Sequence, residues 1–277
     1  MNALFFLAAE EAAPQATWGL FAEGMGFPFI FLLVFVALVW VMISRARAGL
    51  PIPEIRKIAG LDAIDEAIGR ATEMGRPVHF SPGIADVTNP QTIASYAVLG
   101  YVAKVCARYD TRLINTNRQI LVYAINEEII RQAYLEAGRP DAFNPEDVRF
   151  LSDFQFSYTA AVLGILQRER PAAQILYGAF WAESMILVEQ GALVGAIQIG
   201  ATANTHQLPF IVAGCDYALI GEEMYAASAY LSKEPVLTGT VVGQDIGKII
   251  VTVLIVLGVI LTNVVGKGHF LETLLKA

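Results

Sequence analysis

The stretch SMILVEQGALVGAIQIGATA, residues 184–203, decides the fold. It has the length and the apolar composition of a membrane-spanning helix, yet Glu189 and Gln190 lie in its middle. A carboxylate at the centre of a lipid-facing helix is energetically expensive. We therefore predict that residues 184–203 form a crossover helix inside a folded domain and not a third membrane span.

The sequence around this stretch alternates between strand-like and helix-like segments. Within residues 50–235 the strand-like segments are PVHFSPG, TRLINTN, DVRFLSD, AQILYGAF and part of LPFIVAGCDYALI. Such alternation is typical of a parallel sheet with helices on both faces, in which each crossover needs a helix. Between the fourth and fifth strands only residues 184–203 can supply that helix. We predict a five-stranded, mostly parallel, doubly wound (Rossmann-like) α/β domain.

Two other segments have the pattern of membrane spans. Residues 24–44 are uncharged and apolar, and residues 249–266 are an uncharged run between Lys248 and Lys267. About 20 apolar residues cross the hydrocarbon core of a bilayer. The whole chain is 55% hydrophobic and only 16% charged, which is typical of proteins whose partner is the lipid bilayer. We predict a transmembrane helix at each segment.

The basic residues predict the orientation in the membrane. Arg45 and Arg47 follow the first segment, and no Lys or Arg precedes it. Positively charged flanks of membrane spans stay in the cytoplasm. We predict a multi-pass protein of the cytoplasmic (inner) membrane, with residues 1–23 and 267–277 outside and the domain of residues 50–235 in the cytoplasm.

A homo-oligomer is expected from the same stretch of residues 184–203. A helix that is apolar all round is buried on all sides, either by its own sheet or by another subunit. Gly191 and Gly195 have the spacing of small residues that let helices approach closely. We predict that these two glycines lie at an oligomer interface. The net charge of −7 excludes nucleic acid as the main partner, and the sequence does not identify other protein partners.

The sequence lacks the usual catalytic motifs. It has no glycine-rich dinucleotide or phosphate loop after a strand and no nucleophile elbow. The histidines are scattered and Cys106 lies far from Cys215, so neither residue type has metal-ligand spacing. We predict no catalytic residues, no cofactor and no metal.

Polar residues follow the expected strands and predict a cleft. Open parallel sheets bind ligands outside the carboxyl ends of their strands. The candidate ligand-binding residues are Ser81, Asp86, Asn115, Asn117, Asp153 and Glu183. The alternative is that several of them, such as Asn117 and Asp153, only cap helices, as Asn89 before Pro90 is expected to do.

The segments VHFSPG, RLINTNRQ, AESMILVEQGALVGAIQIGATA and IVAGCDYALIGEEMYAASAYLS, between two apolar spans, resemble an uncharacterised family of bacterial and archaeal membrane proteins, the DUF6754 domain family. The resemblance covers nearly the whole chain. It implies a membrane location and a prokaryotic source, and it supplies no activity and no site residues.

Two functions remain open. The first is a membrane-anchored homo-oligomeric scaffold or assembly protein, because catalytic motifs are missing and small apolar residues abound. The second is a membrane-tethered enzyme or small-molecule sensor that uses the cleft at the strand ends, which rests on fold analogy. A transporter or channel fits less well, because the two predicted spans contain no charged residue.

Overall fold

The structure, a computed structural model, describes residues 16–17, 21–22, 26–51, 59–232 and 234–264. The chain forms two compact units, one of Met1–Pro53 with Gly239–Ala277 and the other of Glu54–Thr238. We call the first unit the helical hairpin and the second the α/β domain. Each is described by itself.

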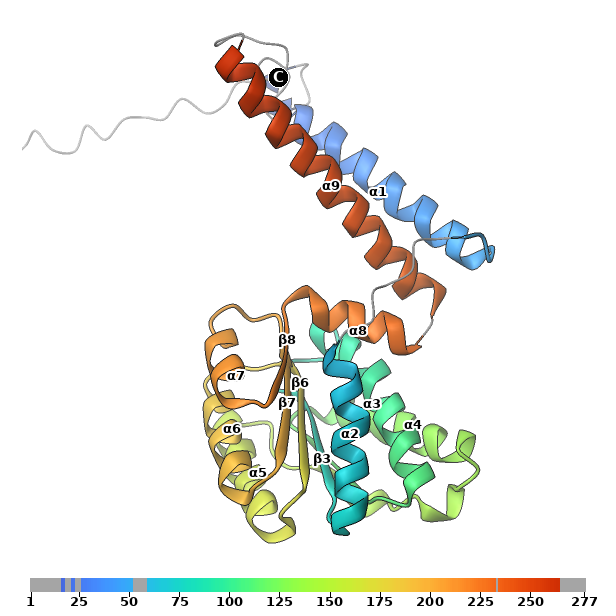
Figure 1. The fold of residues 1–277 in the computed structure, drawn as a ribbon, viewed down its shortest axis with the longest axis vertical. Coiled ribbons are helices and arrows are strands. Elements are labelled where there is room, and N and C mark those ends of the chain that lie inside the picture. The colour runs from blue at the N-terminus through green and yellow to red at the C-terminus, as the bar shows by residue number, and fades with distance from the viewer. Residues whose placement is uncertain (1–15, 18–20, 23–25, 52–58, 233, 265–277) are drawn as a thin grey trace, which may run out of the picture. The chain divides into compact units, whose positions relative to one another are not determined.

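The α/β domain alternates strands and helices along the chain (Figure 1). Its strands are β3 (Val78–Gly83), β4 (Leu113–Asn117), β5 (Val148–Phe150), β6 (Ala173–Ala179), β7 (Ile197–Thr202) and β8 (Tyr217–Ile220). Its helices are α2 (Ala59–Met74), α3 (Pro90–Tyr109), α4 (Ile120–Glu136), α5 (Gln155–Glu169), α6 (Glu183–Val194), α7 (Leu208–Gly214) and α8 (Glu222–Ser232), with short 3₁₀ turns at Pro140–Ala142 and Pro145–Asp147.

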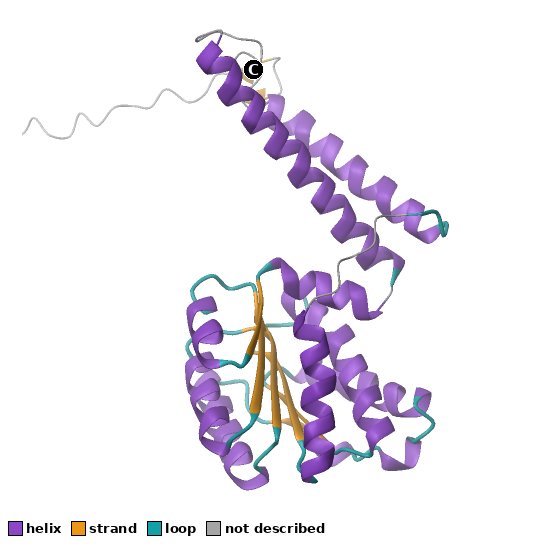
Figure 2. Cartoon of the chain, viewed as in Figure 1, coloured by secondary structure: helices purple, strands orange, loops and turns teal. Residues whose placement is uncertain are grey.

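The six strands form one parallel sheet in the order β5-β4-β3-β6-β7-β8. The direction of strand addition reverses between β3 and β6, because β4 and β5 extend the sheet on one side and β7 and β8 on the other. Helices α5, α6 and α7 cover one face, and α2, α3, α4 and α8 cover the other; Figure 2 shows these three layers. The predicted parallel α/β sheet with helices on both faces is confirmed.

The stretch of residues 184–203 forms a helix and a strand, so the prediction of one helix and of five strands was wrong. Helix α6 ends at Gly195, which has a φ of +71°, and β7 then pairs with both β6 and β8. Strand β7 is buried almost throughout. In a short apolar run that is buried on both faces, the spacing of the apolar residues does not distinguish a strand from a helix.

A separate hydrophobic core fills each helical layer. Ile64 and Ile68 of α2 pack with Phe80 and Leu99 on one face of the sheet. On the other face, the Tyr158 ring is fully buried in a cluster with Leu166, Leu176, Phe180 and Leu187. These two cores fix the helices against the sheet and thereby hold the loops at the strand ends.

The helical hairpin consists of α1 (Gly26–Arg47) and α9 (Pro235–Val264), with a small ladder of β1 (Ala16–Thr17) and β2 (Phe21–Ala22). Both helices are long and apolar enough to cross a membrane. Helix α9 begins at Pro235, well before the predicted span at Ile249. The prediction covered only the uncharged run, whereas the helix continues through the polar residues before it. The first half of α9 therefore includes Asp245 and Lys248, which the predicted span left out.

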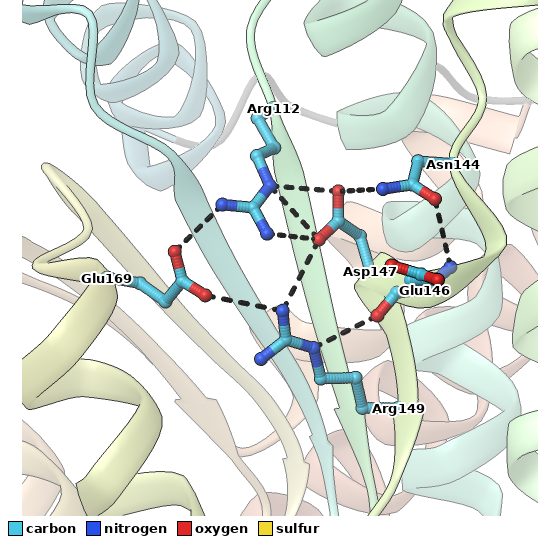
Figure 3. Close-up of polar contacts among 6 residues, drawn as sticks. All are labelled: Arg112, Asn144, Glu146, Asp147, Arg149 and Glu169. Atoms are coloured by element: carbon cyan, nitrogen blue, oxygen red, sulfur yellow. Dashed lines mark hydrogen bonds and ion pairs between the residues drawn. The ribbon is translucent and has the colours of Figure 1, made fainter.

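A network of ion pairs joins the amino ends of β4 and β5 to the end of α5 (Figure 3). The Arg112 guanidinium donates to both oxygens of Asp147, with Nε to Oδ2 at 2.9 Å, and to Glu169 Oε2 at 2.8 Å. Arg149 donates to Glu169 Oε1 at 3.3 Å. Burial alone would raise the pKa of Glu169, but Arg112 and Arg149 hold it below its usual value.

We expect Glu169→Gln to lower the free energy of unfolding by about 1 kcal/mol at pH 7. Because the pKa of Glu169 is lower in the folded than in the unfolded chain, its stabilisation is complete above the unfolded pKa of about 4.3 and is lost as the pH falls through the folded pKa. Denaturant unfolding at pH 7 and pH 3 measures this. The matched control is Glu146→Gln, which keeps the backbone carbonyl that accepts from Arg149 Nε. A loss that persisted unchanged at pH 3 would contradict the assignment.

Candidate functional site

A pocket of about 410 Å³ lies at the carboxyl ends of the strands, where strand order reverses. Loops after β3, β4 and β6 and the start of α5 form its walls. Ligands of open α/β sheets bind at this position, and the volume suits a small molecule. The lining residues are Ile84, Ala85, Asp86, Asn89, Arg118, Gln119, Gln155 and Trp181.

Arg118 ties together two loops at the pocket. Its NH1 donates to the carbonyl of Ile84 at 2.7 Å, and its Nε donates to the carbonyl of Asp153 at 2.8 Å. The guanidinium thereby links the loop after β3 to the loop after β5. Because arginine stays charged at all physiological pH values, the pocket contains a fixed positive charge next to two backbone carbonyls.

Asp86 supplies a negative charge on the same wall. The Thr88 hydroxyl donates to Asp86 Oδ1 at 2.7 Å and the Thr88 backbone N–H at 3.0 Å. These hydrogen bonds hold the pKa of the exposed Asp86 carboxyl below its usual value. Three residues later, Asn89 caps α3 by accepting from the Gln91 N–H at 2.9 Å, as the sequence predicted.

Glu183 organises the remaining wall from a fully buried position. Its Oε1 accepts from the Trp181 N–H at 2.9 Å, and its Oε2 accepts from Gln155 Nε2 at 2.5 Å. The carboxylate therefore joins the loop after β6 to the start of α5. The Trp181 side chain is 45% exposed, so the indole offers a flat apolar surface to a ligand in the pocket.

The predicted cleft residues lie in two different environments. Asp86 lines the pocket, while Glu183 and Asp153 contribute through their contacts with Gln155 and Arg118. Ser81, Asn115 and Asn117 are fully buried within their strands and do not line it. Sequence reasoning did not single out Arg118, Gln155 or Trp181, although each directly follows or lies close to the end of an expected strand.

The buried strand residues form two polar chains, one in each helical layer. In the first chain, the Tyr158 hydroxyl lies between two strand residues, 2.8 Å from Ser81 Oγ and 3.2 Å from Thr116 Oγ1. Thr116 Oγ1 also lies 2.9 Å from His79 Nε2. Burial, helped by the charge of Arg149, lowers the pKa of His79 to about 3, so the ring is neutral at physiological pH.

The second polar chain joins three asparagines. Asn126 Nδ2 donates to Asn117 Oδ1 at 2.7 Å, and Asn117 Nδ2 donates to Asn115 Oδ1 at 2.5 Å. Asn117 does not cap α4, because the cap position of that helix is Gln119. These amides link β4 to α4 inside the core, which explains their burial without a ligand.

Gly191 and Gly195 both have roles within the chain. A Cβ on Gly191 would collide with the side-chain oxygens of Gln174 and Gln198, so this glycine lets α6 lie directly on β6 and β7. Gly195 ends α6 with its positive φ, a conformation that favours glycine. The prediction that they form an oligomer interface remains a prediction.

The arrangement can bind a small polar molecule between a cation, an anion and an aromatic ring. Among the described residues, no three His, Cys, Asp or Glu side chains come together in a way that could hold a metal ion. No curated protein and no solved structure matched the chain. Residues 17–273 do match the family model described as a domain of unknown function, DUF6754, so the chain belongs to that family, as its sequence predicted.

Proposed function

We propose that this protein is a membrane-anchored scaffold that assembles with copies of itself through its α/β domain. The observation that carries the proposal is an apolar surface on the outer side of α6 and α7. Five large apolar side chains form this α6–α7 surface, and their exposed fractions are 56% for Met185, 36% for Ile186, 72% for Leu193, 42% for Phe210 and 49% for Val212.

The composition around the α6–α7 surface supports a protein partner. Clustered exposed apolar side chains mark interaction sites on proteins, and the centres of interfaces are depleted in charge. From Pro171 to Ser232 the sequence contains no Lys or Arg. Helix α6 exposes one charged side chain, that of Glu189, since its other charged residue, Glu183, is buried. Such a surface makes few favourable interactions with water, and it is suited to burial against a second copy of the domain.

The membrane anchor in this proposal is the helical hairpin. Helix α1 contains no charge before Arg45 and Arg47 in its last turn, and these arginines support a cytoplasmic position for that end. With α9 returning across the bilayer, both termini lie outside and the α/β domain lies in the cytoplasm. The strand order supports a Rossmann-like assignment for this domain, because it equals 3-2-1-4-5-6 when the strands are numbered within the sheet.

We expect the double variant Met185→Glu, Leu193→Glu to reduce the native mass of the protein in mild detergent to that of a dimer or less, because four carboxylates would be buried in each contact between two α6–α7 surfaces. Native mass spectrometry measures this. The matched control is Gln132→Glu on α4, which adds a carboxylate at an exposed position of the other helical layer. A wild-type protein that is already monomeric at micromolar concentration would refute the scaffold.

A second function is favoured by the pocket at the strand ends. Asp86, Arg118 and Trp181 converge on a space of about 410 Å³, so the domain is suited to sense a small polar metabolite with an anionic group. Arg118 would bind the anionic group, Asp86 would accept from a hydroxyl or amine, and Trp181 would stack on a ring.

We expect a panel of phosphorylated and carboxylated metabolites to contain a compound that raises the melting temperature of the protein. Asp86→Ala together with Trp181→Ala should weaken its binding at least tenfold and leave folding intact, since both side chains are exposed. Titration calorimetry measures the affinity, and Glu189→Ala serves as the control at an exposed site outside the pocket. If no compound in the panel shifts the melting temperature at millimolar concentration, the sensor is ruled out.

A further inference from the structure

The helical hairpin places two charged residues of α9 beside the middle of α1. A Cβ on Gly239 would touch Ile43, one on Gly243 would touch Val39, and one on Gly247 would touch Phe35. The two helices therefore run antiparallel in a defined register. Asp245 lies between the two glycines that face Val39 and Phe35, and Lys248 follows directly after the second.

These charged side chains point away from α1. Gly239, Gly243 and Gly247 are buried against α1, whereas the side chains of Asp245 and Lys248 are 62% and 49% exposed. The two residues are one helical turn apart, and Lys248 Nζ lies 3.3 Å from Asp245 Oδ1. Gln244 is exposed beside them. Helix α9 thus carries a polar, charged surface on the side that α1 does not cover.

That surface is costly if the hairpin spans a membrane, as the proposed function requires. Helix α1 has no charged residue from Gly26 to Ser44, so its middle would lie in the hydrocarbon layer. The register then brings Asp245 and Lys248 into the same layer, where charged side chains face protein partners or water and not lipid. The charges must therefore be covered by something outside the single hairpin.

We propose that a second copy of this chain covers this surface, with α9 packed against α9 inside the membrane. This proposal rests on the membrane anchoring of the proposed function. An acid and a base one turn apart on the same helix face form a self-complementary surface: around a twofold axis, Asp245 of each copy meets Lys248 of the other. Polar contacts of this kind stabilise helix association in lipid.

Cysteine cross-linking of the full chain in native membranes tests the contact. The background carries Cys106→Ala and Cys215→Ala. Thr252→Cys lies one turn beyond Lys248 on the same face of α9, and we expect oxidation to convert most of this protein to a disulfide-linked dimer. Ile250→Cys, which points to a different side of the helix, is the matched control and should give a several-fold weaker dimer band.

Charge changes separate a contact between copies from a pair within one copy. In the Thr252→Cys background, Lys248→Asp alone and Asp245→Lys alone should each lose the dimer band, because like charges would meet. Co-expression of these two variants with different tags should restore a mixed dimer, although neither copy then contains its own acid–base pair. Failure of this rescue, or a dimer band that persists in Asp245→Asn, Lys248→Gln, would overturn the proposal.

Carbonate extraction of every variant distinguishes a failure of membrane anchoring from a failure of the contact between copies. A wild-type chain that is released from membranes by carbonate would refute the anchoring and with it the contact. A chain that stays in the membrane but gives no more dimer at Thr252→Cys than at Ile250→Cys would refute the contact alone.

Discussion

Gly178→Ala is expected to unfold the α/β domain. Gly178 lies on β6 beside the register shift between β3 and β6, and a Cβ at this position would collide with the carbonyl of Pro82 and lie 3.1 Å from the Gly83 N atom. The obstacle is backbone and not the end of a flexible side chain, so it cannot move without breaking the sheet. We expect a loss on the order of 4 kcal/mol or more, near the total stability of a small domain.

The geometry around Gly178 leaves no other way to accommodate a side chain. The register of β3 against β6 shifts between Ser81 and Gly83. Gly83 has a φ of +83°, and the Ile84 N–H donates to the carbonyl of Ala179 at 2.9 Å. A glycine within a strand is typical of such a close backbone approach. This is also the position in the sheet where strand order reverses.

Denaturant unfolding in mild detergent measures the effect, with Trp18→Phe and Trp40→Phe in the background so that Trp181 reports on the α/β domain alone. The matched control is Gly69→Ala in α2, where a Cβ would meet nothing within 4 Å. Since alanine is a better helix former than glycine, we expect this control to gain about 0.5–1 kcal/mol. Similar unfolding midpoints for the two variants would show that β3 and β6 are not packed as described.

The sequence predicted four of the six strands with little ambiguity, because turn residues bound each of them. Strand β3 ends at Gly83, and α3 begins with Asn89 and Pro90, which are typical start residues of a helix. Strand β7 was missed because residues 184–203 are almost entirely apolar. Gly195 was the available signal: a glycine followed by a run rich in isoleucine is typical of a helix end before a strand.

The candidate site was predicted in part, for a reason that lies in strand geometry. Side chains within a strand point to the two faces of the sheet and not out of its end. Asn115 and Asn117 therefore lie in the layer of α4, where they contact Asn126. Residues in the loops after the strands, such as Asp86 and Arg118, reach the pocket. No sequence pattern specifies how loops from β3, β4 and β6 meet, so Trp181 could not be foreseen.

Gly239→Leu together with Gly243→Leu is expected to separate α1 from α9. A Cβ on Gly239 would lie 2.7 Å from Ile43 Cα and 2.9 Å from its N atom, and a Cβ on Gly243 would lie 3.2 Å from Val39 Cα. In lipid, helices associate chiefly through close packing at small residues. Two leucines would push the backbones apart at two of the three glycine contacts, and the packing that holds the hairpin together would be lost.

Cross-linking within one chain measures this separation. Phe35→Cys and Gly247→Cys face each other in the hairpin, and a short bis-maleimide should join them when Cys106→Ala and Cys215→Ala remove the native thiols. After cleavage at a protease site inserted at Asp141, joined fragments migrate together in a denaturing gel. We expect the joined fraction to fall at least tenfold in the double leucine variant.

The matched control for the hairpin is Gly258→Leu, because a Cβ on Gly258 would meet nothing within 4 Å. It adds a leucine to the same helix and should leave the joined fraction unchanged. If the control and the double variant behave alike, leucine acts on α9 by itself and not on its contact with α1. If only the double variant loses the cross-link, the glycines fix the register that brings Asp245 and Lys248 beside the apolar middle of α1, and the charged surface of α9 follows from that register.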